Sequence, residues 1–207
     1  MNIEEKILLI QSKLEELSKL DKGYEIFGAS DHKYHLNQKL EELDVASFEK
    51  QNSISLPQEY RKFILEVGNG GAGPYYGLQT MEDSLYADLD FKRTGEFVNP
   101  SIPFPFIEPW NMAYEGDEDN ETAYEEFQNM YFSEKWETGL LRICNYGCAV
   151  SLNLVVNGPE KGNIWVDDRG SDGGVYPDSY FGQDERTSFL DWYILWLDSS
   201  LKELENS

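Results

Sequence analysis

Three glycines near the end of the first third of the chain have the spacing of a dinucleotide-binding loop. Gly68, Gly70 and Gly73 match the pattern G-x-G-x-x-G, and Asp88 follows twenty residues after Gly68. In such a loop a strand precedes the glycines and a helix follows, so that the helix N-terminal amides meet the pyrophosphate. Here the order is reversed, with a predicted helix before the glycines and a strand after them. The stretch is interpreted as a helix stop and a turn that needs positive φ, and no cofactor is expected.

The histidines and cysteines offer little material for a metal site or for nucleophilic catalysis. His32 and His35 are the only histidines; they stand in an expected loop beside one acid, Asp31, and are interpreted as surface residues. Cys144 and Cys148 lack a second cysteine pair that would complete a zinc site, so buried or half-buried thiols are expected. We therefore expect no metal and no catalytic residue, and predict that the chain is not an enzyme.

Acidic residues gather in a block in the second half of the chain. Seven of the twelve residues from Glu115 to Glu126 are acidic and none is basic, and Trp110, Tyr114 and Tyr124 lie in or beside this block. Carboxylates next to aromatic side chains are typical of a surface that binds a cationic partner. A solvated loop and helix N-terminus is the alternative, because acids also suit the helix dipole.

A second acidic stretch follows later and is rich in glycine. Its aspartates could bind calcium, but their spacing does not fit an EF-hand loop, so a solvated turn is favoured. Both stretches together give the candidate partner-binding residues, which are Trp110, Tyr114, Glu115, Asp117, Glu118, Asp119, Glu121, Asp167, Asp168 and Asp172.

The composition limits the classes of partner. The 207 residues carry a formal net charge of -22, which opposes binding to nucleic acid or an anionic membrane and favours a cationic protein. Solubility alone is the other interpretation of this charge. No apolar run approaches the ~18 residues that span a bilayer, and the charged N-terminus lacks the pattern of a secretion signal. With only two cysteines, the chain is expected in the cytoplasm.

The elements that position these residues follow from hydrophobic periodicity. An apolar stripe from Ile3 to Leu17 predicts a helix that ends near Leu20 and docks on the domain, in preference to dimerising. In the first half of the chain, the pattern further predicts a loop at 21–34, a helix at 36–50 with a candidate N-cap at Asp44, and a helix from Pro57 to Gly68 that buries Tyr60, Phe63, Ile64 and Val67. A strand at 75–79, a helical turn or loop at 81–89 and an edge strand at Phe104–Ile107 are expected to follow. In the second half, it predicts a helix through Phe132, strands at 139–144, 149–156 and 163–167, a loop at 170–182, and a last helix opened by Ser188 and Asp191 as a capping box.

This order of elements has no regular alternation of strand and helix. It predicts an α+β fold, an antiparallel sheet with helices packed around it and N- and C-terminal helices flanking it. One domain is expected over residues 1–207, with 1–20 as an accessory helix and about 100–136 as an acidic insertion.

An ordered set of short motifs resembles the SUKH superfamily. Ile54 to Phe63, ISLPQEYRKF, is similar to the family's opening "LP..Y..F" signature, and the "NG" that ends its helix has its counterpart in Asn69-Gly70. Glu49 stands where the family has a glutamate in the preceding helix. Residues 143–168 resemble its hairpin with "G.V/I-W..D", and Phe189 to Leu197 resembles its closing aromatic helix. The resemblance spans about residues 36–205 and leaves residues 1–20 and 100–136 outside the core pattern.

The resemblance implies an α+β protein-binding scaffold without established catalytic residues, whose motif residues are mainly core and turn. Bacterial members are mostly immunity proteins that neutralise toxins, many of them nucleases, whereas a fungal branch, the Smi/Knr type, regulates cell-wall synthesis. We therefore expect an immunity protein that binds a basic toxin domain through its acidic surface. A scaffold or regulator without a toxin partner is the alternative, and a calcium-dependent or carboxylate enzyme at residues 167–178 is the third hypothesis. The oligomeric state is left open.

Overall fold

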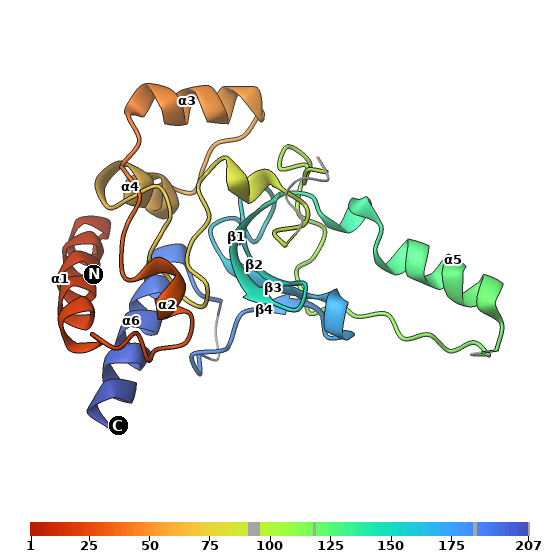
Figure 1. Cartoon of the computed structure of the whole chain (residues 1–207). Helices are drawn as coiled ribbons and strands as arrows, with labels where there is room; N and C mark the ends of the chain where they lie inside the picture. The colour runs from red at the N-terminus through yellow and green to blue at the C-terminus, as the bar shows by residue number, and fades with distance from the viewer. Residues whose placement is uncertain (91–95, 118, 184–185, 207) are drawn as a thin grey trace.

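The computed structural model of the chain describes residues 1–90, 96–117, 119–183 and 186–206, and within them six α-helices are arranged around a four-stranded antiparallel sheet (Figure 1). The α+β fold predicted from the sequence is confirmed. The helices are α1 (Ile3–Leu20), α2 (Ala29–His32), α3 (Glu42–Gln51), α4 (Gln58–Glu66), α5 (Glu121–Tyr131) and α6 (Phe189–Glu205). The strands are β1 (Leu140–Gly147), β2 (Val150–Val155), β3 (Ile164–Asp168) and β4 (Gly174–Pro177).

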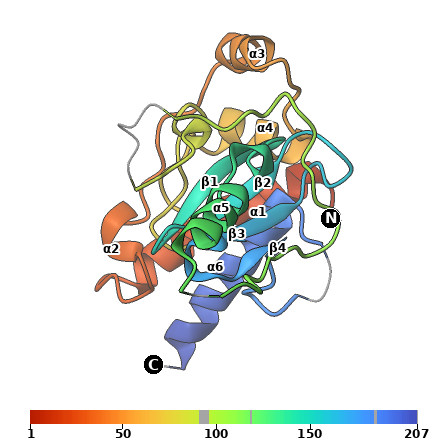
Figure 2. The ribbon, with the colours of Figure 1, turned by 90° about the vertical axis from the view of Figure 1, so that its right-hand side faces the viewer.

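The N-terminal helix docks on the domain, as its apolar stripe predicted. Asn2 and Glu5 form a capping box that satisfies free amides at the start of α1. The stripe of Ile7, Ile10, Leu14 and Leu17 is buried, and α1 packs along the C-terminal helix α6 (Figures 1 and 2). The two ends of the chain therefore form one helical layer on the same side of the sheet.

The sheet is a simple meander whose two faces have different roles. The strands pair in the order β1-β2-β3-β4, each antiparallel to the next. Alternation along β3 sends Ile164 and Val166 into the core under the helices, while Trp165 lies in a second apolar cluster on the opposite face. Phe104 and Phe106 complete that second cluster, so the sheet is covered on both faces at this end.

Two predicted elements and one predicted N-cap before the sheet are corrected by the structure. The helix predicted at 36–50 begins only at Glu42, because Leu36 is extended and forms a bridge with Gly71. Asp44 is not the N-cap; its carboxylate accepts a hydrogen bond from the amide of Glu41, which is the N-cap. The strand predicted at 75–79 is reduced to Leu78, which bridges to Gly71 and Cys144.

Four further predictions are wrong in detail. The loop expected at 21–34 contains α2, and the loop expected at 170–182 contains β4. Phe104–Ile107 forms no strand; its two phenylalanines are buried in irregular backbone instead. Ser188 caps α6 without a side-chain bond to the backbone, because its hydroxyl donates to the carboxylate of Asp191 at 2.8 Å.

The acidic arm and the outer groove as candidate functional site

The acidic insertion forms an arm that leaves the body of the protein on the sheet side away from the helical layer. We call residues 110–136 the acidic arm. Figure 1 shows α5 standing out from the sheet, and Figure 2 looks along the arm from its outer end. The arm begins where Trp110 pairs with Val175 of β4, through backbone hydrogen bonds of 2.8 and 2.7 Å. An extended outgoing segment and the returning helix α5 therefore start from the edge of the sheet.

A continuous row of aromatic rings runs along the inside of the arm. Trp110 stacks on Tyr131 with centroids 5.6 Å apart, and Tyr131 stacks on Phe127 at 5.6 Å. Phe127 and Tyr124 both contact Tyr114 of the outgoing segment, at 5.3 and 5.2 Å. Since each ring touches the next, the row links the two segments from the root to near the tip and stiffens an element that packs little against the rest of the protein.

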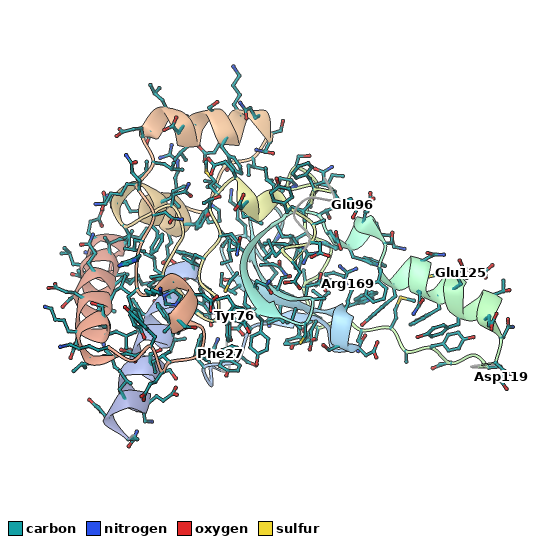
Figure 3. All side chains as sticks on the ribbon, viewed as in Figure 1. Phe27, Tyr76, Glu96, Asp119, Glu125 and Arg169 are labelled. Carbon is teal, nitrogen blue, oxygen red and sulfur yellow. The ribbon has the colours of Figure 1, made fainter. Side chains whose placement is uncertain are left out.

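The tip of the arm carries exposed carboxylates. The side chain of Asn120 accepts a hydrogen bond from the amide of Ala123 and so caps α5, while the Tyr114 hydroxyl donates to the backbone carbonyl of Asp117. Asp119 lies at the outer end in Figure 3. The sequence from residue 94 to 134 has no lysine, arginine or histidine, so no cation within the stretch neutralises this charge. On the arm, the exposed acids of the predicted set are Glu115, Asp117, Asp119 and Glu121, and Glu118 lies outside the described residues.

Asp167 lies in the interior and not on the acidic surface. Its carboxylate accepts hydrogen bonds from Arg169 at 2.8 and 2.7 Å and from Arg142 at 3.1 Å, and Glu137 bridges the same two arginines at 2.8 and 3.0 Å. Burial opposes the charged form of Asp167, but the hydrogen bonds from Arg169 and the charge of Arg142 outweigh it and lower its pKa to about 2. We call these four residues the ion cluster.

The other two aspartates of the glycine-rich stretch occupy different positions. Asp168 is half-buried and accepts a hydrogen bond from the Tyr176 hydroxyl at 3.3 Å. Asp172 is exposed, and its carbonyl accepts from the side-chain amide of Asn111 at the root of the arm, at 2.7 Å. The structure thus brings Asp172 beside the arm, whereas Asp167 supports the arm from below, because Arg169 also donates to the carbonyl of Tyr131 at 3.0 Å.

The ion cluster forms the floor of a hollow that sequence reasoning missed. We call this hollow of about 660 Å³ the outer groove. It lies against the outer face of the sheet near the root of the arm, where Figure 3 shows Glu96 and Arg169. Besides the ion cluster, its lining includes the acids Asp88, Asp90, Glu96 and Glu134 and the rings of Phe97 and Phe132. These residues come from four separate segments, so no local sequence pattern announces the groove.

The sequence profile of the SMI1/KNR4 family (SUKH-1) matches residues 39–181, which include the sheet, the arm and the groove. The chain belongs to this family. No curated protein and no solved structure gives a significant match.

The residues of the SUKH signature stabilise the fold of this structure. Glu49 accepts a hydrogen bond from the amide of Leu56 at 2.8 Å and pairs with Arg61 at 3.3 Å, which ties α3 to the start of α4. Asn69 accepts from the amide of Met81 at 2.8 Å. The signature side chains predicted as core are buried, namely Leu56, Tyr60, Phe63, Trp165 and Trp196. The family signature therefore does not itself form the exposed surface.

The glycines of the G-x-G-x-x-G pattern form a turn, and the two histidines differ in burial. Gly70 and Gly71 have φ values of +83° and +96°, as a turn after a helix requires. His35 is exposed as predicted, but His32 is half-buried, with its ring 6.0 Å from that of Trp196, and burial lowers its pKa to about 4. Among the described residues, no three histidine, cysteine, aspartate or glutamate side chains gather as a metal ion would need. Cys144 is buried, whereas Cys148 is exposed.

Three exposed aromatic side chains, Phe27, Tyr76 and Tyr180, form a surface that we call the aromatic patch. The rings of Phe27 and Tyr76, which are labelled in Figure 3, are 5.4 Å apart, and both are exposed. Tyr180 is exposed beside Tyr146 at 6.1 Å. Sequence reasoning assigned no role to these residues.

Within the described part of the chain, none of the helices is long and apolar enough to cross a membrane.

Proposed function

We propose that the chain is an immunity protein that binds and neutralises a cognate basic toxin domain through the acidic arm, and that it acts by binding and not by catalysis. The single observation that carries the proposal is the arm itself. It extends a stretch of carboxylates without cations away from the body on a row of stacked rings. Membership of the SUKH superfamily supports the choice of partner, because the family includes toxin immunity proteins.

Electrostatics favour this role for the arm. Carboxylates that share one sign and stand away from the body create a negative potential that attracts a positively charged surface and speeds its association. Screening by salt acts over about 8 to 10 Å at ionic strengths of 0.1 to 0.15 M, so the attraction weakens as salt is added. A basic toxin domain that binds nucleic acid has the complementary charge.

Exposed apolar side chains on α5 supply the contacts that hold a complex once formed. Tyr124 and Met130 are 43% and 48% exposed. Tyrosine is enriched at binding hot spots, where a few residues carry most of the binding energy. The arm therefore combines charge for the encounter with apolar contacts for the bound state.

The test is to look for a toxin domain among the products of the neighbouring genes and to measure its association with the chain. We expect growth rescue when the chain is produced together with that toxin, and an association rate constant that falls as salt rises. The triple variant Asp117→Asn, Asp119→Asn, Glu121→Gln should lower this rate constant about tenfold at low salt and change the dissociation rate little.

The matched control removes three exposed carboxylates from the opposite side of the protein. Glu16→Gln, Asp31→Asn and Glu205→Gln change the net charge equally, on α1, α2 and α6. They should reduce the association rate constant much less than the arm variant. Equal effects of the two triple variants, or an absence of binding to the toxin domain, would overturn the proposal, and a non-toxin partner would favour a regulatory scaffold.

A further inference from the structure

A second hollow lies on the inner face of the sheet, which is the face turned towards the helical layer. We call this hollow of about 480 Å³ the tyrosine pocket. Leu152 and Val166, two side chains of the core under the helices, are part of its lining. The lining also includes four tyrosines and two carboxylates, namely Tyr75, Tyr146, Tyr176, Tyr180, Asp168 and Asp178. Because ligand pockets span roughly 300 to 1,000 Å³, the hollow is large enough for a side chain and its flanking backbone.

The tyrosine rings of the pocket hold one another in place. The rings of Tyr75 and Tyr146 are 4.6 Å apart at an angle of 70°, and Tyr180 meets Tyr75 at 5.3 Å and 75°. Tyr75 has a φ of +53°, which is unusual for a large side chain, and its carbonyl oxygen packs closely on Gly28. Tyr75 is buried, whereas Tyr180 is 60% exposed. The pocket therefore combines a fixed inner ring with a ring that a ligand can reach.

The two aspartates of the pocket accept hydrogen bonds from uncharged donors of the described chain. Asp168 accepts from the hydroxyl of Tyr176 at 3.3 Å. Asp178 accepts from the amide of Tyr180 at 3.3 Å and from the side-chain amide of Gln183 at 3.2 Å. Burial raises the pKa of Asp178, as expected for a carboxylate that no cation neutralises. A cation in the pocket would favour the charged form of both groups.

The segments that form the pocket supply no cation. They contain no lysine, arginine or histidine over residues 69–90, 143–160, 163–168 and 170–185. Arg169, which follows Asp168, is engaged in the ion cluster. The basic pair at 92–93 follows Asp90, whose carboxylate lies across the sheet in the outer groove and accepts from Asn145 at 2.6 Å. The composition of the pocket is therefore complementary to a cationic ligand.

The aromatic patch borders the pocket and indicates what kind of molecule carries the cation. The Phe27 ring lies 6.2 Å from that of Tyr75, and the Tyr76 ring lies against Gly147 in the turn before Cys148, another lining residue (Figure 3). Exposed apolar surface of this kind is typical of protein-binding sites. A peptide segment would cover the patch with the residues next to its cation, which a small free cation would not do.

We propose that the tyrosine pocket binds an arginine or lysine side chain of a protein partner, with the stem of the side chain against Tyr180 and its cationic head towards Asp168 and Asp178. Tyrosine faces attract cations, and long basic side chains bury their stems on apolar surface while the head stays polar. The inference goes beyond the proposed function, because the pocket lies on the inner face of the sheet and needs no residue of the acidic arm.

A peptide titration tests the pocket directly. The probe is acetyl-Leu-Arg-Leu-amide, added to the ¹⁵N-labelled protein at low salt, and the neutral control is the same peptide with citrulline in place of arginine. We expect the arginine peptide to shift the amide resonances of Cys148, Ser179 and Tyr180, which line the pocket, and to leave those of Asp119 and Glu125 on the arm nearly unchanged. The citrulline peptide should bind about fivefold more weakly, because it lacks the charge for cation–π contact. Tetramethylammonium should also bind more weakly than the arginine peptide, because it leaves the aromatic patch uncovered.

A ring variant separates cation–π attraction from apolar contact. Tyr180→Leu keeps an apolar side chain at an exposed position and should raise the dissociation constant of the arginine peptide about two- to fivefold. The same variant should leave the affinity for the citrulline peptide unchanged. The matched control is Tyr124→Leu, an exposed tyrosine on the arm, which should change neither affinity.

A charge variant tests the carboxylate. Asp168→Asn keeps an oxygen that can accept from the Tyr176 hydroxyl, and it should raise the dissociation constant of the arginine peptide about threefold, as expected for a partly exposed ion pair. Asp172→Asn removes the same charge from the exposed turn nearby and should change the affinity little.

Three results would overturn the assignment. The first is an absence of saturable shifts at the amides that line the pocket, and the second is equal affinity for the arginine and citrulline peptides. The third is an equal effect of Tyr180→Leu and Tyr124→Leu. Tighter binding of tetramethylammonium than of the arginine peptide would overturn a protein as the source of the cation. The charge variants of the arm should leave this titration unchanged, so the pocket and the proposed function stand or fall separately.

Discussion

The indole rings of Trp110 and Trp136 lie 4.7 Å apart and close the root of the acidic arm. Trp110 is where the chain enters the arm, and Trp136 is where it returns to the sheet. The Trp136 indole nitrogen also donates to the carbonyl of Met130 at 2.9 Å, which fixes the end of α5. The direction in which the arm points is therefore set by contacts at its base, because the hydrogen bonds and ring contacts of the described tip residues stay within the arm.

Replacing Trp136 with alanine should loosen the arm and leave the helical layer intact. Large-to-small changes of aromatic residues in cores cost about 3 to 5 kcal/mol, and a half-buried indole should cost about 2 kcal/mol. We expect faster hydrogen exchange at the amides of α5 and unchanged exchange in α6. The control Tyr124→Ala, near the tip, should affect only its own turn. Equal acceleration in α5 and α6 would show that the arm is not a separate unit.

Removing the central carboxylate of the ion cluster should destabilise the whole protein. Asp167→Asn leaves Arg142 and Arg169 with Glu137 as their remaining carboxylate partner, and loss of one member of a buried ion pair costs about 3 to 5 kcal/mol. The measurement is the free energy of unfolding in urea. The control Asp172→Asn changes an exposed aspartate nearby and should cost less than about 0.5 kcal/mol. Similar losses for both variants would contradict the structural role of the cluster.

The same cluster has a defined pH dependence. The folded pKa of Asp167, about 2, lies below the value of about 4 for an unperturbed aspartate, so folding favours its charged form. Its stabilising contribution is complete above about pH 4 and is lost as the pH falls through 2. The difference in stability between the wild type and Asp167→Asn should therefore shrink as the solution is acidified below about pH 4.

His32 should make the protein less stable in mildly acidic solution. Burial lowers its folded pKa to about 4, below the ordinary value of 6.5, so the unfolded chain binds a proton in this range and the folded protein does not. Its penalty is absent above about pH 6.5 and grows as the pH falls towards 4. We expect His32→Gln to lose less stability than the wild type between pH 6.5 and 4.5, whereas the exposed control His35→Gln should follow the wild type. Parallel curves for all three proteins would contradict the burial of His32.

Gly28 should tolerate no side chain. Its φ is +78°, and a Cβ atom there would lie 1.7 Å from the carbonyl oxygen of Tyr75, beneath the aromatic patch. Gly182 has the same kind of backbone, φ +79°, but nothing within 4 Å of the added atom. Gly182→Ala should therefore cost about 1 kcal/mol for the left-handed backbone alone, and Gly28→Ala should cost clearly more in thermal or urea unfolding. Equal costs for the two variants would mean that the backbone around Gly28 and Tyr75 shifts easily to make room for the added Cβ atom.

The elements that could be predicted from the sequence are those defined by local patterns of apolar and turn residues. The helix at Ile3–Leu20 follows from its own apolar stripe, and the central strands follow from their apolar runs and turns. Elements defined by distant partners were missed. β4 is four residues in a glycine-rich stretch, and it becomes a strand because it pairs with β3 and with Trp110. Leu36 left its predicted helix for the same kind of reason, since its partner Gly71 is far along the chain.

The candidate site shows the same division. The exposed acids of the arm were visible as a block without cations, and the structure leaves them exposed. Asp167 was grouped with them because it is followed by loop residues, yet alternation along β3 already placed it on the same face as the buried Trp165. Arg169 lies only two residues after Asp167, but no local pattern could supply Arg142, because Arg142 meets Asp167 only when β1 lies two strands away from β3 in the same sheet.

The separation between the tip of the arm and the core has a consequence for how such a protein can diversify. Substitutions at Asp117 or Asp119 remove no core contact, so they should change the charge of the arm without reducing the capacity of the protein to fold. Substitutions at Trp110 or Trp136 do the opposite. If the acidic arm binds the partner as proposed, specificity and foldability are encoded by different residues, and a recombined arm with the same two tryptophans would give the scaffold a new target in one step.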